Sequence, residues 1–484
     1  MEKKGKPDED MLLPKHSKAF YEQKDNGLGR KSNILLVTTD QQRTDALGCY
    51  GSTFAISPNL DRLASEGVLY TDAYSASPVC MAYRACLLTG VHPPVNGLIE
   101  NSTGSRNPDL TTFTDLLKEQ GYKNIIVGKT HFGSIPDSVT VYDDGHNGDD
   151  GAEGKNKETR ADDGRAERAI AEMGKIAGSG EKFFMHLSLL APHGPILPPP
   201  EWLDKYKDVK FPDINYTPGE EQKLPGMLKH MYNIKEDTVI DTGLEKIHEK
   251  RKAYYAYSSY ADEQIGKVLK YLDDSGLREN TLVIYTVDHG NELNDHGING
   301  SKHDFFDAAW RVPLIISMPG TIPSGEKRDF AVTTDVTATI LGAAGIKSYT
   351  VQGFDLIPSL LSGEQSPRRC GVGTIYKSAA LATRDWKIAY YFEDCFTMLF
   401  NLKKDPKEQI NLADDERYKG IKNQLLNALL IWRSDIMDVE TLFKNTKAGG
   451  GPVAKRLYSR TMSIRGTDPE ERLNKAVEKL DVSD

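Results

Sequence analysis

The segment NILLVTTD, residues 33–40, is a continuous run of apolar and β-branched residues that ends in a carboxylate. Such a run predicts a strand buried on both faces, as the strands of a parallel sheet are. The segment SPNLDRLASEG, residues 57–67, has a serine and a proline at its start and a glycine at its end, so it predicts a helix with both ends marked. A buried strand followed by a well-delimited helix is typical of α/β proteins.

The same alternation continues along the chain. Helices are expected to begin at Cys80 and to cover residues 110–120 and 246–277. Further strands are expected at residues 68–74, 122–127, 182–191, 281–288 and 312–318. This pattern predicts an α/β fold in which helices cover both faces of a large mixed, mostly parallel sheet.

The length of 484 residues exceeds what one hydrophobic core normally supports, so two domains are expected. We predict an N-terminal extension (1–30), a large α/β domain (31–365), a small C-terminal antiparallel sheet plus helix (366–440) and a flexible tail (441–484). The segment SGEQSPRR, residues 362–369, has the composition of a linker between the two domains. Residues 133–165 are rich in glycine and aspartate and are expected to form a surface loop; they lack the ligand spacing of a calcium-binding loop.

Composition excludes several classes of protein. The net charge of −9 argues against a nucleic-acid partner, and no apolar run is long enough to span a bilayer. The first residues contain charges but no apolar core of a signal peptide, so a cytoplasmic location is expected, or a periplasmic one if a leader was removed. Five cysteines form an odd, sparse set, which does not indicate a disulfide framework.

Polar side chains follow several of the predicted strands at the point where each strand ends. They are Asp40, Gln41, Lys129, His131, His193, Asp288 and His289. Because ligands of open α/β sheets bind at the carboxyl ends of the strands, these residues are expected to converge. Two carboxylates, an amide oxygen and an imidazole suit Ca²⁺, Mg²⁺ or Mn²⁺ better than zinc. The cations Arg84, Lys129 and Lys302 would surround that metal, and this arrangement favours a tetrahedral oxyanion, either sulfate or phosphate, as the ligand.

The segment PVCMAYRACLLTG, residues 78–90, places a cysteine at the start of a helix with an arginine one turn later. The helix dipole and a nearby cation both favour the thiolate form of Cys80, and Arg84 would lie on the same face. The alternative is a buried cysteine in a packed helix.

Six motifs in order resemble type I, formylglycine-dependent sulfatases of the alkaline-phosphatase superfamily, over about residues 31–415. The maturation motif of that family resembles CMAYRACLLTG (80–90). The other five matches are GKTHFG (128–133), PHGP (192–195), DHGNELNDHGINGSK (288–302), RVPLII (311–316) and LFNLKKDPKEQINLA (399–413).

The resemblance implies a set of roles for these residues. A separate maturation enzyme would oxidise Cys80 to formylglycine (3-oxoalanine), whose hydrate attacks sulfur. The metal ligands would be Asp40, Gln41, Asp288, His289 and the modified residue 80, with Ca²⁺ the expected ion. Arg84 and Lys129 would steady the nucleophile; Lys129, His193 and Lys302 would bind sulfate; and Asn101 would face the substrate. His193, alone or with Lys302, would protonate the leaving alcohol.

We further hypothesise that His131 is the base that releases sulfate. A base need only remove the proton of the hydroxyl left on residue 80, and an imidazole is suited to this at neutral pH. Lysine would stay protonated there, so Lys129 is a poorer candidate.

Three departures from the commonest family pattern leave alternatives open. Tyr83 and Ala82 lie inside the maturation motif where a smaller residue and a proline are commoner, and Gln41 replaces a second aspartate. The latter is shared with phosphonate monoester and phosphodiester hydrolases of the superfamily, which are the main rival. A non-catalytic oxyanion-binding homologue is a second rival.

The expected partners are a small sulfate ester or sulfated saccharide and the maturation enzyme. A homo-oligomer through the tail, which carries Lys455, Arg456 and Arg460, is a further expectation.

Overall fold

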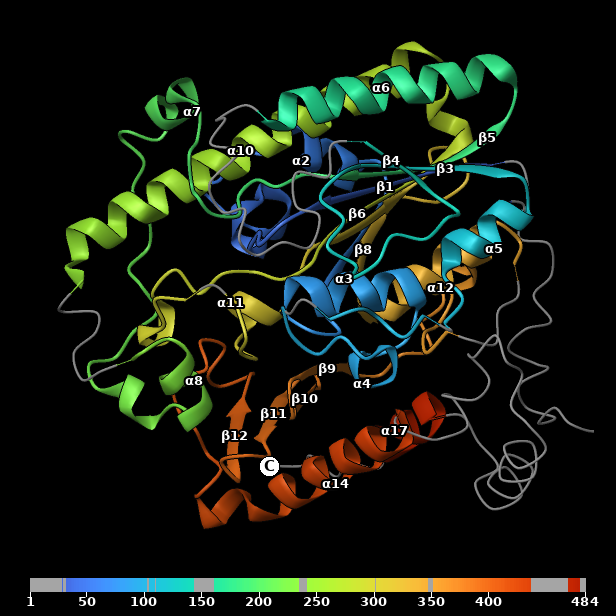
Figure 1. Cartoon of the computed structure of the whole chain (residues 1–484). Helices are drawn as coiled ribbons and strands as arrows, with labels where there is room; N and C mark the ends of the chain where they lie inside the picture. The colour runs from blue at the N-terminus through green and yellow to red at the C-terminus, as the bar shows by residue number, and fades with distance from the viewer. Residues whose placement is uncertain are drawn as a thin grey trace, which may run out of the picture.

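A computed structural model describes residues 28, 32–101, 104–108, 110–142, 161–234, 242–300, 302–346, 351–436 and 469–478 (Figure 1). Nearly all of the predicted N-terminal extension lies outside the described residues. The same holds for residues 143–160 of the aspartate-rich loop and for Lys455, Arg456 and Arg460 of the tail.

The large domain is built on an eight-stranded sheet with strand order β4-β3-β5-β1-β6-β7-β2-β8. Its strands are β1 (Asn33–Thr39), β2 (Val68–Tyr74), β3 (Tyr122–Gly128), β4 (Thr140–Tyr142), β5 (Lys182–Ser188), β6 (Thr281–Val287), β7 (Leu314–Ser317) and β8 (Gly325–Val332). Only β7 runs antiparallel to its neighbours β6 and β2; the other pairs are parallel. The predicted mixed, mostly parallel sheet is confirmed.

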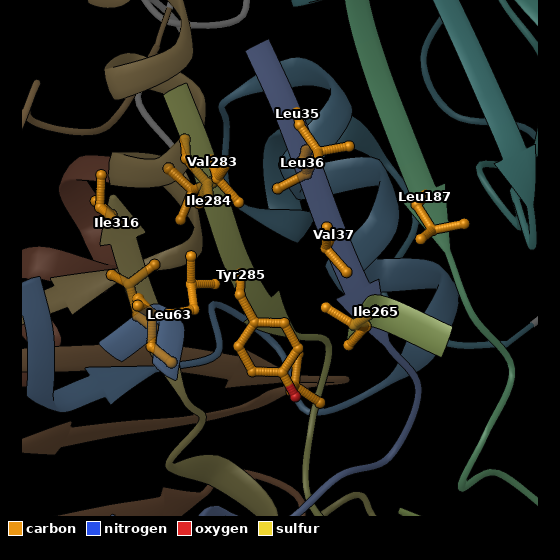
Figure 2. Close-up of a cluster of buried hydrophobic side chains, with 14 of the residues drawn as sticks. Leu35, Leu36, Val37, Leu63, Leu187, Ile265, Val283, Ile284, Tyr285 and Ile316 are labelled. Atoms are coloured by element: carbon orange, nitrogen blue, oxygen red, sulfur yellow. The ribbon is translucent and has the colours of Figure 1, made fainter. Parts of the chain in front are cut away.

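The central strand β1 is buried at every position, as its unbroken apolar run predicts. Val37 pairs in register with Leu187 of β5 on one side and with Tyr285 of β6 on the other. Figure 2 shows these side chains packed with Ile265 of a covering helix. Because the three strands are parallel and in register, their carboxyl ends reach the same edge of the sheet.

Helices cover both faces of the sheet (Figure 1). One layer contains α2 (Pro58–Ser65), α6 (Ala161–Ser179) and the long α10 (Leu244–Asp274), which packs against both of the others. The opposite layer contains α3 (Cys80–Thr89), α5 (Phe113–Glu119) and α12 (Thr333–Ala343), which pack on one another. Every residue of α3 is buried, and most of its residues are apolar, as an enclosed helix requires.

Short helices occupy the connections. They are α4 (Pro93–Asn96), α7 (Pro200–Lys205), α8 (Gly226–Met231), α11 (Asp307–Trp310) and α13 (Ile357–Ser362). Single turns of 3₁₀ helix are η2 (Thr44–Ala46), η3 (Gly48–Tyr50), η4 (Glu220–Lys223), η5 (Arg278–Asn280), η6 (Asp295–Gly297) and η7 (Glu416–Tyr418).

A second, antiparallel sheet follows, with strand order β12-β11-β10-β9. It comprises β9 (Gly371–Ile375), β10 (Ser378–Ala382), β11 (Trp386–Tyr391) and β12 (Phe396–Asn401). Its residues form two clusters, one with Phe306 and Trp310 of the large domain and one with Trp432 of α14 (Lys419–Ile436).

Residues 469–478 depart from the predicted flexible tail. They form helix α17 (Pro469–Glu478), which packs against α14 (Figure 1). Leu473 is fully buried there, and the Asn474 side chain accepts a hydrogen bond from the Arg369 backbone N–H at 3.1 Å. Among the described helices, none combines the length and apolar character that crossing a membrane requires.

Candidate active site

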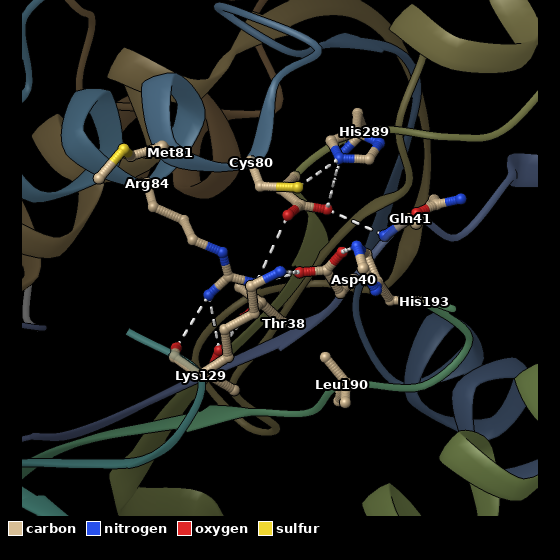
Figure 3. A network of polar contacts seen from close by, with 12 residues as sticks. Thr38, Asp40, Gln41, Cys80, Met81, Arg84, Lys129, Leu190, His193 and His289 are labelled. Carbon is tan, nitrogen blue, oxygen red and sulfur yellow. Dashed lines mark hydrogen bonds and ion pairs between the residues drawn. The ribbon is translucent and has the colours of Figure 1, made fainter. Parts of the chain in front are cut away.

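The polar residues predicted at the strand ends meet at the carboxyl edge of the large sheet (Figure 3). Asp40 directly follows β1, Lys129 follows β3, and Asp288 with His289 follows β6. All four are buried, with at most 2% of any of them exposed. The architecture therefore gathers charged groups from distant parts of the sequence into one enclosed site.

Four of these side chains form a cluster that fits a divalent cation. Asp40, Cys80, Asp288 and His289 each offer one ligand atom, and these atoms lie within 4.8 Å of one another. Asp40 Oδ1 is buried and accepts no hydrogen bond from the part of the chain that the structure describes. Burial and the neighbouring Asp40 carboxylate raise the pKa of Asp288, as expected where two carboxylates lie close together.

The orientation of His289 also suits a metal ligand. Its Nδ1 lies 2.9 Å from the backbone oxygen of Gly290, and a carbonyl can only accept, so Nδ1 carries the proton. Nε2 lies 3.1 Å from the Cys80 sulfur, and in the neutral ring it offers its lone pair to the cluster. Metal-binding histidines usually donate the N–H of the nitrogen that does not bind the metal to a carbonyl or carboxylate, as Nδ1 of His289 does here.

Gln41, the fifth predicted metal ligand, lies beside this cluster on the side away from Arg84 (Figure 3). Its backbone has a left-handed φ of 68°. Its N–H donates to Asp288 Oδ1 at 2.9 Å, and its carbonyl accepts from the Tyr254 hydroxyl at 2.7 Å. The backbone of Gln41 thus fixes Asp288, while metal binding by its side chain stays a prediction.

Cys80 is the first residue of α3 and is 1% exposed. Lys302 Nζ lies 2.7 Å from its sulfur. Burial favours the neutral thiol, but the charges of Lys129, Lys302 and His289 and a hydrogen bond with His131 together hold the pKa of Cys80 well below its usual range. Residue 80 therefore sits in a strongly electropositive position that stabilises an anion.

The shared helix face suggested that Arg84 would contact the Cys80 sulfur. Its hydrogen bonds instead go to the Asp40 carboxylate and to two groups beside it. Its guanidinium donates to Asp40 Oδ2 at 2.9 Å, to the Lys129 backbone oxygen at 2.9 Å and to Ser188 Oγ at 2.8 Å. Lys129 Nζ lies 2.7 Å from the same Asp40 oxygen. Despite burial, Lys129, His193 and Arg84 hold the pKa of Asp40 well below its usual range, so Asp40 remains a carboxylate.

Comparison with known proteins bears on this arrangement directly. The sulfatase family model matches residues 32–346, and a model of the C-terminal part of N-sulphoglucosamine sulphohydrolase matches residues 295–435. The chain belongs to the sulfatase family.

The sulfatase assignment is supported by relatives of known name. The N-acetylglucosamine-6-O-sulfatase of Bacteroides thetaiotaomicron is 25% identical, over 83% of this chain and 86% of its own. A protein solved in complex with its substrate D-glucosamine-2-N,6-O-disulfate has a TM-score of 0.73 at 23% identity, covering 84% of this chain and 98% of its own. The phosphonate monoester hydrolase of Agrobacterium radiobacter also has a TM-score of 0.73, at 22% identity, covering 84% and 96%.

At these identities the two structures show a shared fold, whereas the family match identifies the reaction. The protein is a sulfatase of the alkaline-phosphatase superfamily and hydrolyses sulfate esters, which confirms the sequence-based identification.

In the sulfatase, His193 closes the site from the loop after β5. Its Nδ1 lies 2.7 Å from the Gly194 backbone oxygen and so carries a proton, which leaves Nε2 facing Asp40 Oδ1 at 3.9 Å. Nε2 can donate a proton only when the ring is charged. This orientation suits the predicted role of a general acid.

Asp162 holds the His193 loop and was missed by the sequence analysis, which placed it in a surface loop. Its side chain is 1% exposed and accepts from the backbone N–H groups of Leu190 at 3.1 Å and Ala191 at 2.9 Å. Arg165 donates to it at 2.6 Å. The composition of residues 133–165 suggested solvent exposure because aspartate is rarely buried without a partner. Two of the groups that Asp162 binds, the N–H groups of Leu190 and Ala191, lie 28 and 29 residues further along the chain.

Asn101 reaches the site differently from the prediction. Its Oδ1 accepts a hydrogen bond at 3.0 Å from the backbone N–H of Met81. Met81 lies in the first turn of α3, where backbone N–H groups have no partner within the helix. The Asn101 oxygen thus caps the helix that carries Cys80, and substrate contact by its amide nitrogen stays a prediction.

Proposed function

We propose that this sulfatase acts on a sulfated saccharide through residue 80, converted from cysteine to formylglycine by a separate maturation enzyme. A divalent cation, with Ca²⁺ the first candidate, would be held by Asp40, Asp288, His289, the Gln41 side chain and residue 80. The observation that carries the proposal is the position of Cys80, whose sulfur shares one 4.8 Å cluster with both carboxylates and His289. Because Cys80 is 1% exposed, a modifying enzyme would reach it before folding is complete.

The two implied groups would supply distinct chemistry. Bound at this cluster, the cation would offset the two carboxylates and favour loss of a proton from the attacking hydroxyl. The hydrated aldehyde would supply two hydroxyls on one carbon, one to attack sulfur and one to lose its proton when sulfate is released.

The surrounding side chains would bind the sulfate and move the protons. Lys129 and Lys302 flank residue 80 and would offset the negative charge that develops on the sulfate oxygens. Charged His193 would donate its Nε2 proton to the leaving alcohol oxygen. His131, which already forms a hydrogen bond with residue 80, would remove the proton from the remaining hydroxyl.

Arg84 would act through Asp40 rather than on the substrate. Its bonds to Asp40, Ser188 and the Lys129 backbone fix the carboxylate and the Lys129 strand end together. A fixed arrangement of charges lowers the reorganisation needed during the reaction.

The saccharide assignment is supported by the relative named N-acetylglucosamine-6-O-sulfatase and by the fold relative with a glucosamine disulfate substrate. Gln41 is the observation that favours the rival phosphonate monoester hydrolase, whose fold is equally close. The deciding experiment compares kcat/KM of matured protein on N-acetylglucosamine 6-sulfate, 4-nitrophenyl sulfate and a 4-nitrophenyl phosphonate ester. We expect the sulfate esters to be preferred; a higher kcat/KM on the phosphonate ester would overturn the proposal.

A further inference from the structure

Tyr376 adopts a backbone conformation that is unusual for tyrosine. Ile375 and Ser378 pair across β9 and β10, so Tyr376 and Lys377 form a two-residue turn. At the first turn position Tyr376 has a φ of 47°, in the left-handed region where such turns prefer glycine. Strained residues of this kind are concentrated at functional sites.

The Tyr376 ring connects the small domain to the catalytic cations. It stacks on the His303 imidazole, with ring centroids 5.7 Å apart and planes inclined by 22°. His303 follows Lys302, whose Nζ lies 2.7 Å from Cys80 Sγ. A half-buried aromatic ring of the small sheet thus contacts the residue next to the lysine that reaches the nucleophile position.

His303 is held in one orientation by Tyr232. The Tyr232 hydroxyl accepts from the Lys302 backbone N–H at 3.3 Å and lies 3.0 Å from His303 Nδ1. Burial and the charge of Lys302 lower the pKa of His303 to about 3, so the ring is neutral. The hydroxyl and Nδ1 share one hydrogen bond, which fixes the orientation of the ring and leaves Nε2 available for a second one. A Cβ on Gly300 would lie 1.9 Å from the Tyr232 ring, so only glycine permits this packing.

The segment that the Tyr376 ring packs on is hydrogen-bonded to the chain just before residue 80. The His303 backbone N–H donates to the Pro78 backbone oxygen at 3.1 Å, and Pro78 lies two residues before Cys80. The Tyr376 ring therefore stacks on the Lys302–His303 segment, which also contacts the chain leading into the nucleophile helix.

We infer that Tyr376 and His303 bind the alcohol portion of the sulfate ester and determine leaving-group specificity. A pyranose ring would pack on the Tyr376 ring, and a sugar hydroxyl would form a hydrogen bond with His303 Nε2. This inference rests on the proposed function, since it takes the sulfate to be held by Lys129, His193 and Lys302.

The test compares matured wild-type protein with Tyr376→Ala and Tyr376→Phe. The matched control is Tyr390→Ala, because Tyr390 also contacts an aromatic ring, Phe392, edge-to-face with centroids 4.8 Å apart, but belongs to the cluster around α14. Kinetics are measured on N-acetylglucosamine 6-sulfate and 4-nitrophenyl sulfate, and inorganic sulfate is titrated as an inhibitor to report on the sulfate site alone.

Tyr376→Ala should lower kcat/KM by about 3- to 10-fold, mainly through KM, as loss of one aromatic contact predicts. Inhibition by sulfate should stay within twofold, and Tyr376→Phe and Tyr390→Ala should resemble wild type. An unchanged KM in Tyr376→Ala, or an equal weakening of sulfate inhibition, would overturn the inference while leaving the proposed function intact. Absence of wild-type turnover on both esters would instead overturn the proposed function, and the inference with it.

Discussion

Replacing Asp162 with alanine should damage catalysis even though this residue touches neither the metal cluster nor the nucleophile. The change removes the carboxylate that Arg165 contacts at 2.6 Å and the acceptor of the Leu190 and Ala191 backbone N–H groups. Both charged side chains are at most 2% exposed. Breaking a buried pair from one side costs about 3 kcal/mol of unfolding free energy.

The effect on the reaction follows from the position of His193, two residues beyond Ala191. A misplacement of about 1 Å at a catalytic group costs on the order of 10²-fold in rate. We therefore expect kcat of Asp162→Ala to fall about 10- to 100-fold on 4-nitrophenyl sulfate, with the content of bound metal unchanged. The assay combines initial rates, elemental analysis and the thermal unfolding midpoint.

The neighbouring Asp163 provides the matched control. It pairs with Lys267 at 2.8 Å, but the two side chains are 21% and 41% exposed. Removal of such a pair costs about 0–1 kcal/mol, so Asp163→Ala should retain wild-type rates. If Asp162→Ala fails to fold, Asp162→Asn keeps one acceptor and serves instead. A folded Asp162 variant with wild-type kcat would refute the reasoning.

Three further predictions concern the metal, the sulfate site and pH. Asp288→Asn should lose bound divalent cation, so full occupancy by elemental analysis would contradict its role. Lys302→Ala should lower kcat/KM by about 10²–10³-fold and weaken inhibition by sulfate; an unchanged inhibition constant would exclude sulfate contact. Burial and the Arg84 charge lower the pKa of His186 to about 3 in the folded state, against about 6.5 unfolded. The unfolded state therefore binds more protons below pH 6.5, and stability should fall on acidification by up to about 1.4 kcal/mol per pH unit from this residue. Urea midpoints of His186→Gln should show a shallower slope between about pH 6 and pH 4; parallel slopes would argue against this.

Strand-ending residues were the part of the site most readable from sequence. Asp40, Lys129 and Asp288 each follow a mainly buried strand, and parallel strands in register bring such positions to one edge. The structure confirms that they converge. Helical spacing correctly placed Cys80 and Arg84 one turn apart on the same helix. It could not show that Arg84 forms its ion pair with Asp40, which comes from another part of the chain.

The parts not predicted depend on partners far apart in sequence. Residues 362–369 have the composition of a linker, yet Ser366 and Arg368 are buried and Arg368 forms an ion pair with Asp335 at 2.5 Å. Composition reports only the local tendency of a segment to be exposed. Arg368 is buried because it pairs with the Asp335 carboxylate, which lies more than thirty residues earlier. Likewise, Ser188 accepts a hydrogen bond from Arg84 at the last position of β5, where a lone serine carries no sequence signal.

The central claim is that hydrolysis depends on residue 80 in its formylglycine form. The most direct measurement plots the rate of sulfate ester hydrolysis against the fraction of formylglycine at residue 80, determined by peptide mass spectrometry on protein made with varied amounts of the maturation enzyme. We predict a rate proportional to that fraction and no turnover by Cys80→Ala. Full activity in protein whose Cys80 is unmodified, or in Cys80→Ala, would contradict the account.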